Sequence, residues 1–259
     1  MMNNPNRPIG VFDSGVGGLT VLKTLQAQFP NEDFIYLADH AYCPYGIKSA
    51  SQVAHRVSEV GQQMIERGVK FIIIACNTAT ANAAELMKTS PVPVIGVIEP
   101  TAKKAFEVSK DKKIALLATD LTVKMGSYQH LLRDATVHAL GCSVFVPLAE
   151  GIDRDSSDTA AKVANHLQSL KEFEFDTIIY GCTHFGLLDQ AIQKALPGKI
   201  VVECGEPTAS AVAEILTCSK LSQEMQTLGT TTLYTTGSPK VFKDQITWYK
   251  GSFLGPYQW

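Results

Sequence analysis

Two cysteines occupy matching positions in this chain. Cys76 and Cys182 each close a short apolar run, and small polar residues follow each of them. This pattern is typical of a buried strand that turns into a helix, which is where open α/β sheets place ligands. Racemisation of a carbon centre needs a proton-transfer group on each of its two faces. The matched pair of thiols therefore predicts this kind of chemistry.

Each thiol has candidate partners that could move its proton. A thiol with an ordinary pKa of about 8.5 is only partly ionised at neutral pH, so an oriented acid or base beside it helps. Asp13 is the candidate beside Cys76, whereas Glu150 and His184 are the candidates beside Cys182. Each also has a structural interpretation: a helix cap for Asp13, a solvated loop carboxylate for Glu150 and a hydrogen-bonded turn histidine for His184. The paired cysteines favour the catalytic interpretation.

Other polar groups follow predicted strands. The loop 13–18, Asp-Ser-Gly-Val-Gly-Gly, would let a ligand approach a helix N-terminus, whose free N–H groups favour an anion. The loop lacks the glycine order of a dinucleotide-binding motif, so we favour a carboxylate over a nucleotide. A small zwitterion needs donors for its carboxylates and acceptors for its ammonium group. The candidates for these contacts are Asp13, Ser14, Asp39, the turn Pro44-Tyr45-Gly46, Asn77, Thr78, Thr183 and His184.

Short apolar runs alternate with amphipathic helical patterns along the chain. Strands are expected at 9–12, 34–38, 71–75, 92–98, 113–118, 137–146, 177–180, 199–202 and 231–235. Helices are expected at 18–28, 49–67, 79–88, 158–169, 187–196 and 207–218. This alternation predicts parallel sheets that are covered on both faces, and hence an α/β fold.

A weak internal repeat divides these elements into two similar halves. Cys182 lies 106 residues after Cys76, and nearly the same shift places 114–119 on 9–14. We therefore expect two pseudo-symmetric three-layer αβα domains with mostly parallel sheets and the active site in the cleft between them. The expected first domain is discontinuous, 1–98 plus 208–259, the second is 99–207, and the chain crosses between them at 96–101 and 204–207.

Composition narrows the class of protein. The 259 residues carry 23 basic and 25 acidic side chains, which favours neither nucleic acid nor an anionic membrane as a partner. Residues 1–8 lack the apolar stretch of a signal peptide, and no run approaches the roughly 20 apolar residues of a membrane span. We expect a cytoplasmic protein whose six cysteines are reduced. No Cys-x-x-Cys pair occurs, so no metal site is expected.

Six motifs, taken together, resemble the glutamate racemase family. They are Asp-Ser-Gly-Val-Gly-Gly-Leu at 13–19, Ala-Asp at 38–39 leading to Pro-Tyr-Gly at 44–46, Ala-Cys-Asn-Thr-Ala at 75–79, Gly-Val-Ile-Glu-Pro at 96–100, Gly-Cys-Thr-His at 181–184 and Tyr-Thr-Thr-Gly-Ser-Pro at 234–239. The resemblance covers residues 9–251, and the motifs follow the expected order.

The resemblance implies a racemase that interconverts L- and D-glutamate without a cofactor and supplies D-glutamate for bacterial peptidoglycan. It implies that Cys76 takes the α-proton of D-glutamate and Cys182 that of L-glutamate. Asp13 would assist the first thiol, and Glu150 with His184 the second. A homodimer is among the assemblies that it implies. The substrate contacts that it implies are Asp13, Ser14, Tyr45, Gly46, Asn77, Thr78, Thr183 and His184.

The chain departs from this family pattern in three places. Phe185-Gly186 replaces Tyr-Pro, Thr101 stands where Gly or Ala is common, and the segment 204–207, Cys-Gly-Glu-Pro, replaces one of Asp-Ser type. None of these changes removes a proposed catalytic group. The remaining cysteines match no catalytic position and are interpreted as small apolar fillers: Cys43, Cys142, Cys204 and Cys218.

Two other functions fit part of the pattern. A racemase acting on aspartate or a hydantoin would use the same paired thiols and would differ in the length of its pocket. A binding protein could hold an acidic amino acid in a two-lobed cleft without chemistry, but binding alone does not require thiols. The complete motif set favours glutamate racemisation.

Overall fold

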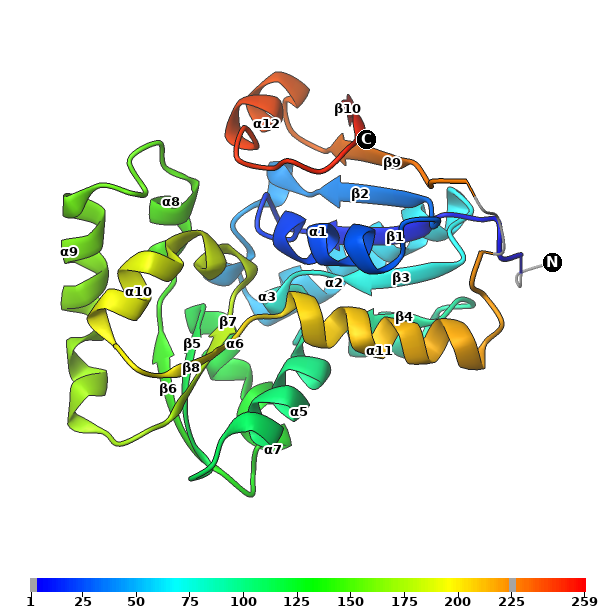
Figure 1. Ribbon diagram of the computed structural model, residues 1–259. Coiled ribbons are helices and arrows are strands. Elements are labelled where there is room, and N and C mark those ends of the chain that lie inside the picture. Colours follow the sequence, from blue (N-terminus) through cyan, green and yellow to red (C-terminus); the bar gives the residue numbers. More distant parts are fainter. Residues whose placement is uncertain (1–3, 224–226) are drawn as a thin grey trace.

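The computed structural model describes residues 4–223 and 227–259, which form two parallel β-sheets (Figure 1). The first sheet has the strand order β10-β9-β2-β1-β3-β4 and the second has the order β6-β5-β7-β8. The strands are β1 (Ile9–Asp13), β2 (Phe34–Ala38), β3 (Phe71–Ile74), β4 (Val94–Gly96), β5 (Lys113–Ala118), β6 (Thr136–Gly141), β7 (Thr177–Gly181), β8 (Ile200–Val202), β9 (Thr231–Thr235) and β10 (Leu254–Gln258). Within the described residues every strand pair is parallel, so the expected α/β class is confirmed.

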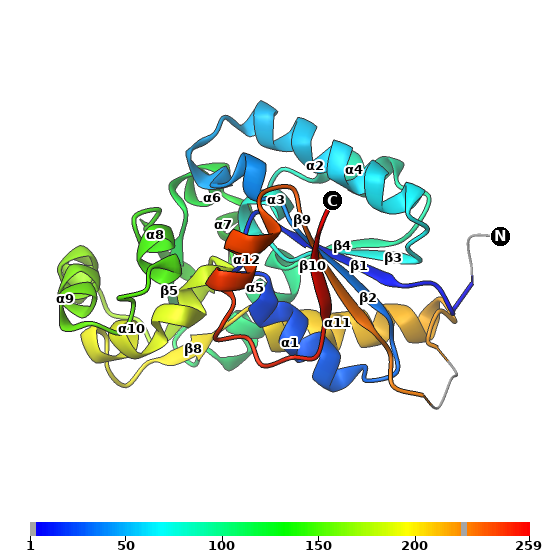
Figure 2. The same cartoon turned by 90° about the horizontal axis from the view of Figure 1, so that it is seen from above.

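Helices cover both faces of each sheet. In the first half α2 and α4 lie on one face and α1 and α11 on the other (Figure 2). In the second half α5 and α7 pack on one face and α8, α9 and α10 on the other. The helices are α1 (Leu19–Gln28), α2 (Ala50–Glu66), α3 (Asn77–Thr80), α4 (Ala84–Thr89), α5 (Ile98–Val108), α6 (Asp120–Met125), α7 (Ser127–Leu131), α8 (Phe145–Glu150), α9 (Ser157–His166), α10 (Asp189–Ala195), α11 (Gly205–Cys218) and α12 (Pro239–Gln245). The expected three-layer αβα arrangement is therefore present in both halves.

The central strands β1, β3, β5 and β7 are largely apolar because each sheet is covered on two faces. In β3, Phe71 and Ile73 join the core beneath α1 and α11, whereas Ile72 and Ile74 join the core beneath α2. This alternation follows from the two-residue period of a strand. The same division splits β5 and β7 between the two cores of the second half.

The two halves place their thiols in equivalent positions. Strand β3 pairs with β1, and strand β7 pairs with β5, so each cysteine follows the strand beside the first strand of its half. All the strands run the same way within a sheet, so their carboxyl ends share one edge. Figure 1 shows these edges turned toward the junction of the two halves.

Several expected element boundaries are wrong. The strand expected at 92–98 ends at Gly96, because α5 begins at Ile98, and the strand expected at 137–146 ends at Gly141. The helix expected at 79–88 is divided between α3 and α4. The Thr80 hydroxyl bonds the carbonyl of Cys76 at 2.8 Å, a side-chain contact that competes with regular helix. Strand β10 was not expected, and its proline is tolerated because it lies at a sheet edge.

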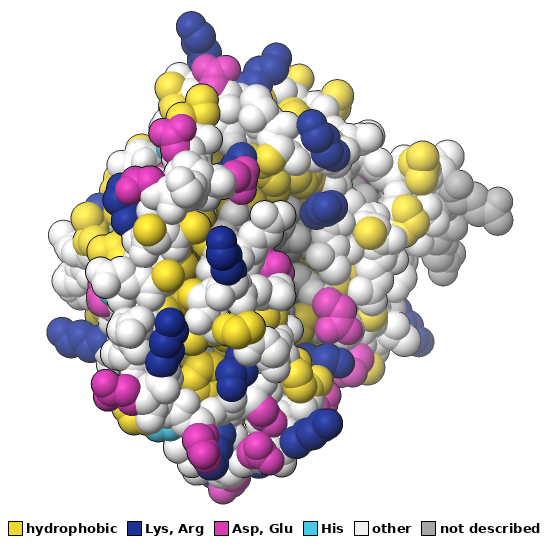
Figure 3. All heavy atoms as spheres, turned by 60° about the vertical axis from the view of Figure 1, so that its left-hand side comes forward, with side chains coloured by type: hydrophobic (Ala, Val, Ile, Leu, Met, Phe, Trp, Pro, Cys, Tyr) yellow, Lys and Arg dark blue, Asp and Glu magenta, His cyan; other side chains and the backbone are white. Residues whose placement is uncertain are grey.

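The two crossing segments become the first turns of helices. Residues 98–101 begin α5 and residues 205–207 begin α11, which packs against both α1 and α5. Since α11 contacts both halves, the domain boundaries at 98/99 and 207/208 stay a prediction. In the described ranges, no helix combines the length and apolar character needed to cross a membrane. On the face drawn in Figure 3, basic and acidic side chains are interspersed.

Candidate active site

Cys76 and Cys182 face one small cavity at the junction of the two halves. Cys76 is the N-cap of α3, and Cys182 directly precedes the 3-10 turn η4 (Thr183–Leu188). The thiol-bearing residues are only 6% and 7% exposed. The cavity has a volume of about 20 Å³, and both halves contribute to its wall. The structure thus brings together two residues that are 106 positions apart in the sequence.

Most of the predicted contact residues line this cavity. They are Ser14, Tyr45, Gly46, Asn77, Thr78, Thr183 and His184. Asp13 and Glu150 lie behind the wall, where each contacts residues that line it. Asp39 is fully buried away from the cavity and forms a two-pronged ion pair with Arg56, with donor–acceptor distances of 2.9 and 2.7 Å.

Sequence reasoning missed part of the wall. Pro44, Thr119 and Val146 also line the cavity, although only Pro44 was named, as part of a turn. A signal for Thr119 was present, because the internal repeat places it on Ser14. Its hydroxyl lies 2.9 Å from that of Thr78, so it joins the two halves directly beside the cavity.

Cys76 lies in an environment of backbone donors and nearby negative charge. Its sulfur accepts the Ala79 N–H at 3.4 Å, and its thiol lies 3.7 Å from Ser14 Oγ. Burial raises the pKa of Cys76 well above its ordinary value, and the charge of Asp13 raises it further. The contacts with Ala79 and Ser14 act in the opposite direction. Thiolate formation at Cys76 therefore needs additional positive charge.

Asp13 holds the glycine loop that follows β1. Its Oδ2 accepts the N–H groups of Gly15 at 3.0 Å and Gly18 at 3.1 Å. Its Oδ1 accepts the Thr183 hydroxyl from the other half at 3.5 Å. The helix-cap interpretation is wrong, because the N-cap of α1 is Gly18 and no side chain bonds to this cap. The fully buried Asp13 carboxylate instead organises the loop between β1 and α1.

Cys182 is joined to a histidine–carboxylate pair. Its sulfur is 3.8 Å from Nδ1 of His184, and Nε2 of that ring is 3.0 Å from Oε1 of Glu150. Burial acts to lower the pKa of His184, but the bonds to Cys182 and Glu150 outweigh it and raise the pKa well above its ordinary value. Burial likewise opposes ionisation of Glu150, yet the bond to His184 lowers its pKa. These two shifts favour an imidazolium paired with a carboxylate.

The glycine loop of the first half packs tightly against the Cys182 side. A Cβ atom on Gly17 would lie 2.4 Å from Nδ1 of His184 and 2.6 Å from Oγ1 of Thr183, well inside contact distance. The loop is held from behind by the Tyr36 hydroxyl, which donates to the Gly15 carbonyl at 2.8 Å. Only glycine at position 17 permits this close approach of the two halves.

The cavity is smaller than an amino acid. A volume of about 20 Å³ accommodates about one water molecule, whereas small-molecule pockets span roughly 300–1,000 Å³. An amino acid can therefore bind only if residues of the cavity wall move. The structure describes a closed arrangement of the site.

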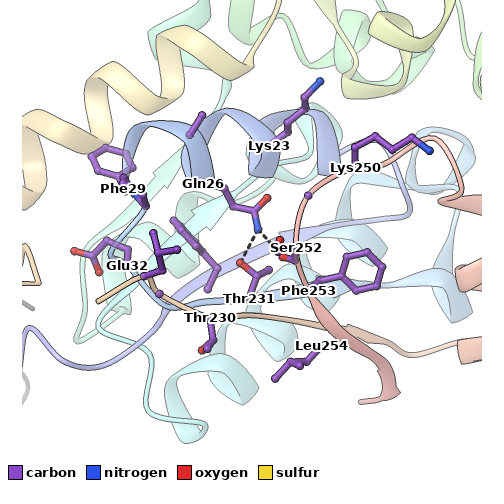
Figure 4. Close-up of a pocket in the computed structure, with 16 residues that line it drawn as sticks. Lys23, Gln26, Phe29, Glu32, Thr230, Thr231, Lys250, Ser252, Phe253 and Leu254 are labelled. Carbon is purple, nitrogen blue, oxygen red and sulfur yellow. Dashed lines mark hydrogen bonds between the residues drawn. The ribbon is translucent and has the colours of Figure 1, made fainter. Parts of the chain in front are cut away.

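The described chain also contains larger cavities. A cavity of about 530 Å³ lies at the starts of β2 and β9, the opposite sheet edge from the thiols (Figure 4). There Gln26 donates to Thr231 Oγ1 at 2.8 Å and to the Ser252 carbonyl at 3.0 Å, and the lining contains no thiol. Within residues 4–223 and 227–259, no three His, Cys, Asp or Glu side chains gather in an arrangement that could hold a metal ion.

The comparisons with known proteins agree on one family. The profile of the family described as Asp/Glu/Hydantoin racemase matches residues 9–215. A glutamate racemase of Bacillus cereus is 39% identical over 245 residues, which cover 92% of this chain and 91% of the relative. The crystal structure of glutamate racemase isoform RacE1 from Bacillus anthracis superposes with a TM-score of 0.94 at 31% identity, covering 99% of this chain and 98% of the other. Glutamate racemase from Francisella tularensis in complex with D-glutamate superposes with a TM-score of 0.91 at 27% identity, with the same coverage.

Proposed function

This chain belongs to the Asp/Glu/hydantoin racemase family of isomerases, and we propose that it interconverts L- and D-glutamate by proton transfer at the α-carbon. The observation that carries the proposal is the meeting of two thiols, one from each half, at a single cavity. Close similarity to glutamate racemases along nearly the whole chain supports glutamate as the substrate.

The proposed reaction uses each thiol once in each direction. From D-glutamate, the Cys76 thiolate takes the α-proton, so an S–H bond forms while the C–H bond breaks. The electron pair of that bond passes into the α-carboxylate. The Cys182 thiol then gives its proton to the opposite face of the carbon, which leaves L-glutamate and a Cys182 thiolate. The reaction from L-glutamate runs through the same steps in reverse.

The substrate itself supplies charge that the Cys76 side needs. Burial and the Asp13 carboxylate disfavour a thiolate at Cys76 in the closed site. The α-ammonium group of glutamate brings a positive charge into the same cavity, which stabilises the thiolate. On the other side, the protonated His184 beside Glu150 stabilises negative charge on Cys182.

Neutral donors around the cavity suit the two carboxylates of glutamate. The hydroxyls of Ser14, Thr78 and Thr183 and the amide of Asn77 lie in its wall. The Tyr45 hydroxyl is already bonded to Asp39 at 2.6 Å, so Tyr45 and Gly46 offer backbone groups and the tyrosine ring. These residues bind substrate in the proposal, and no metal or cofactor takes part.

We also propose that the enzyme acts in the cytoplasm and supplies D-glutamate for peptidoglycan. This role follows from the motif resemblance, and depletion of the protein in its host should be rescued by external D-glutamate. A homodimer stays a prediction, for which the mass in solution is the direct measurement.

The proposed activity is tested by circular dichroism with L-glutamate, D-glutamate, L-aspartate and D-aspartate, without added cofactor. We expect the optical signal of both glutamates to decay to zero and that of both aspartates to persist. Decay with aspartate alone would support the related racemase. An unchanged signal with all four amino acids would contradict racemisation and support a binding protein.

A further inference from the structure

Asn77, next to Cys76, has both ends of its side-chain amide bonded within the protein. The Tyr128 hydroxyl of α7 donates to its Oδ1 at 2.7 Å. Its Nδ2 donates to the sulfur of Cys204 at 3.4 Å. An amide nitrogen carries two hydrogens, so one N–H of Asn77 remains available to a ligand in the cavity that this residue lines.

Cys204 belongs to the hydrophobic core beneath α1 and α11, and its thiol also makes polar contacts. Its thiol lies 3.4 Å from the carbonyl oxygen of Tyr180, which accepts the S–H, and 3.9 Å from Oδ1 of Asn77. The Thr101 hydroxyl donates to the Val97 carbonyl at 2.6 Å and is close enough to Cys204 and Tyr128 to influence the pKa of each. Two of the three departures from the family pattern, Thr101 and Cys204, thus meet behind a residue of the active-site wall.

These groups are buried and keep their protons. Asn77 and Cys204 are 2% and 3% exposed, and Tyr128 and Thr101 are fully buried. Burial raises the pKa of Cys204 to about 11 and that of Tyr128 well above its ordinary value. Both therefore act as neutral donors at physiological pH. In such a setting an unpaired polar atom is costly, which fixes the orientation of the amide.

The cluster also ties Asn77 to both crossings between the halves. Thr101 lies in the first turn of α5, by which the chain enters the second sheet, and Cys204 directly precedes α11, by which it returns. Asn77 itself belongs to the first half, at the start of α3. Its orientation is thus set by residues of the other half and of the crossing segments.

We propose that Tyr128 and Cys204 are positioning residues that hold the Asn77 amide with its nitrogen, and not its oxygen, presented to a substrate carboxylate. The proposal rests on the proposed function for the identity of the substrate. In the reversed orientation Oδ1 would face the carboxylate, and two acceptors would repel each other. The role of the two residues is therefore exerted through Asn77 and not by contact with glutamate.

The first test separates KM from kcat. Tyr128→Phe removes the donor to Asn77 Oδ1, so KM for both enantiomers should rise roughly five- to tenfold, while kcat changes less than about twofold. Cys204→Ala should raise KM by roughly two- to fivefold, and Cys204→Ser, which keeps both a donor and an acceptor, should restore it. Tyr249→Phe and Cys142→Ala are matched controls, because their polar atoms bond Gln26 and the Leu140 carbonyl and not Asn77. A fall in kcat at unchanged KM would overturn the proposal.

The second test asks whether Tyr128 acts through Asn77. We expect Tyr128→Phe to add nothing to the KM of an Asn77→Ala variant, because the group that it positions is already gone. If Tyr128→Phe raised KM by the same factor in the wild type and in Asn77→Ala, Tyr128 would have an independent structural role. This result would overturn the proposal.

A third readout needs no substrate. The side-chain amide protons of Asn77, identified by their loss in Asn77→Ala, should exchange slowly with water in the ligand-free protein and faster in Tyr128→Phe. Unchanged exchange would contradict the positioning role even in an active enzyme. Conversely, faster exchange in a protein that does not racemise glutamate would retain the positioning role and reject the proposed function.

Discussion

The two thiols lie at equivalent strand ends but in different electrostatic surroundings. Cys76 has backbone and hydroxyl contacts from Ala79 and Ser14, with the Asp13 carboxylate nearby. Cys182 contacts His184, whose ring is bonded to the Glu150 carboxylate. The internal repeat therefore duplicates the position of the thiol but not the groups that stabilise its thiolate form. We expect the two proton transfers to respond differently to mutation and to pH.

Thermodynamics limits how that difference can be seen. L- and D-glutamate have equal free energies in water, so kcat/KM must be the same in both directions for the enzyme and for every variant. A mutation of a group beside one thiol therefore cannot lower kcat/KM in one direction alone. The asymmetry has to be sought in isotope effects, in half-reactions and in the pH dependence of the local ion pair.

The largest effect on activity is expected when either thiol is removed. Cys76→Ala and Cys182→Ala should each lower kcat about 10⁴-fold in both directions, because in the proposed mechanism each direction uses one thiol as base and the other as acid. Optical rotation of glutamate over time measures this. Cys218→Ser is the control, since that thiol is exposed on α11. Ready turnover by either alanine variant would contradict the two-thiol mechanism.

A smaller effect on activity is expected when one of the carboxylates beside the thiols is replaced. Asp13→Asn and Glu150→Gln should each lower kcat/KM by about 10²-fold, as expected for loss of proton-transfer assistance. With Asp13→Asn, the primary isotope effect should grow for α-deuterated D-glutamate, because the Cys76 step becomes limiting. With Glu150→Gln it should grow for α-deuterated L-glutamate. If the isotope effect grew for the same enantiomer in both variants, Asp13 could not be assigned to Cys76 and Glu150 to Cys182.

The smallest effect concerns stability and pH. The pKa of His184 is raised in the folded state, so its contribution is complete below about pH 6.5 and is lost as the pH rises through the raised pKa. The pKa of Glu150 is lowered, so its contribution is present above about pH 4.3 and is lost as the pH falls through the lowered value. Glu150→Gln should therefore reduce the free energy of unfolding by about 2 kcal/mol at pH 6 and by less at pH 10.

Urea denaturation at the two pH values measures this difference. Glu174→Gln serves as the control, because Glu174 and its partner Lys113 form an exposed pair that contributes little. A larger loss for Glu150→Gln at pH 10 than at pH 6 would contradict the ion pair.

The local sequence pattern correctly placed Cys76 and Cys182 at one site but did not reveal their surroundings. Parallel strands share one carboxyl edge, so two polar strand ends such as those at Cys76 and Cys182 can be assigned to one site from their sequence pattern alone. Thr119 could have been found by the same rule. The contacts of Cys204 could not, because its hydrogen bonds join residues from several distant segments. The neighbours of Cys204 in the sequence, Glu203 and Gly205, give no sign of such partners.

Element ends were the least predictable part of the fold. Apolar periodicity alone extends a strand through 92–98, whereas the packing of Gly96 against Thr80 and the start of α5 end it earlier. A built Cβ at Gly96 would lie 2.1 Å from Thr80 Cγ2, a tertiary contact that no local pattern reports. The division of the expected helix 79–88 has the same origin in the side-chain bonds of Thr80.

Exchange of the α-proton with deuterium oxide in the two alanine variants tests the central claim most directly. Cys182→Ala retains only Cys76, so it should introduce deuterium into D-glutamate with retention of configuration and leave L-glutamate unlabelled. Cys76→Ala should label only L-glutamate. Labelling of the same enantiomer by both variants, or of both enantiomers by either one, would contradict the assignment of one thiol to each face.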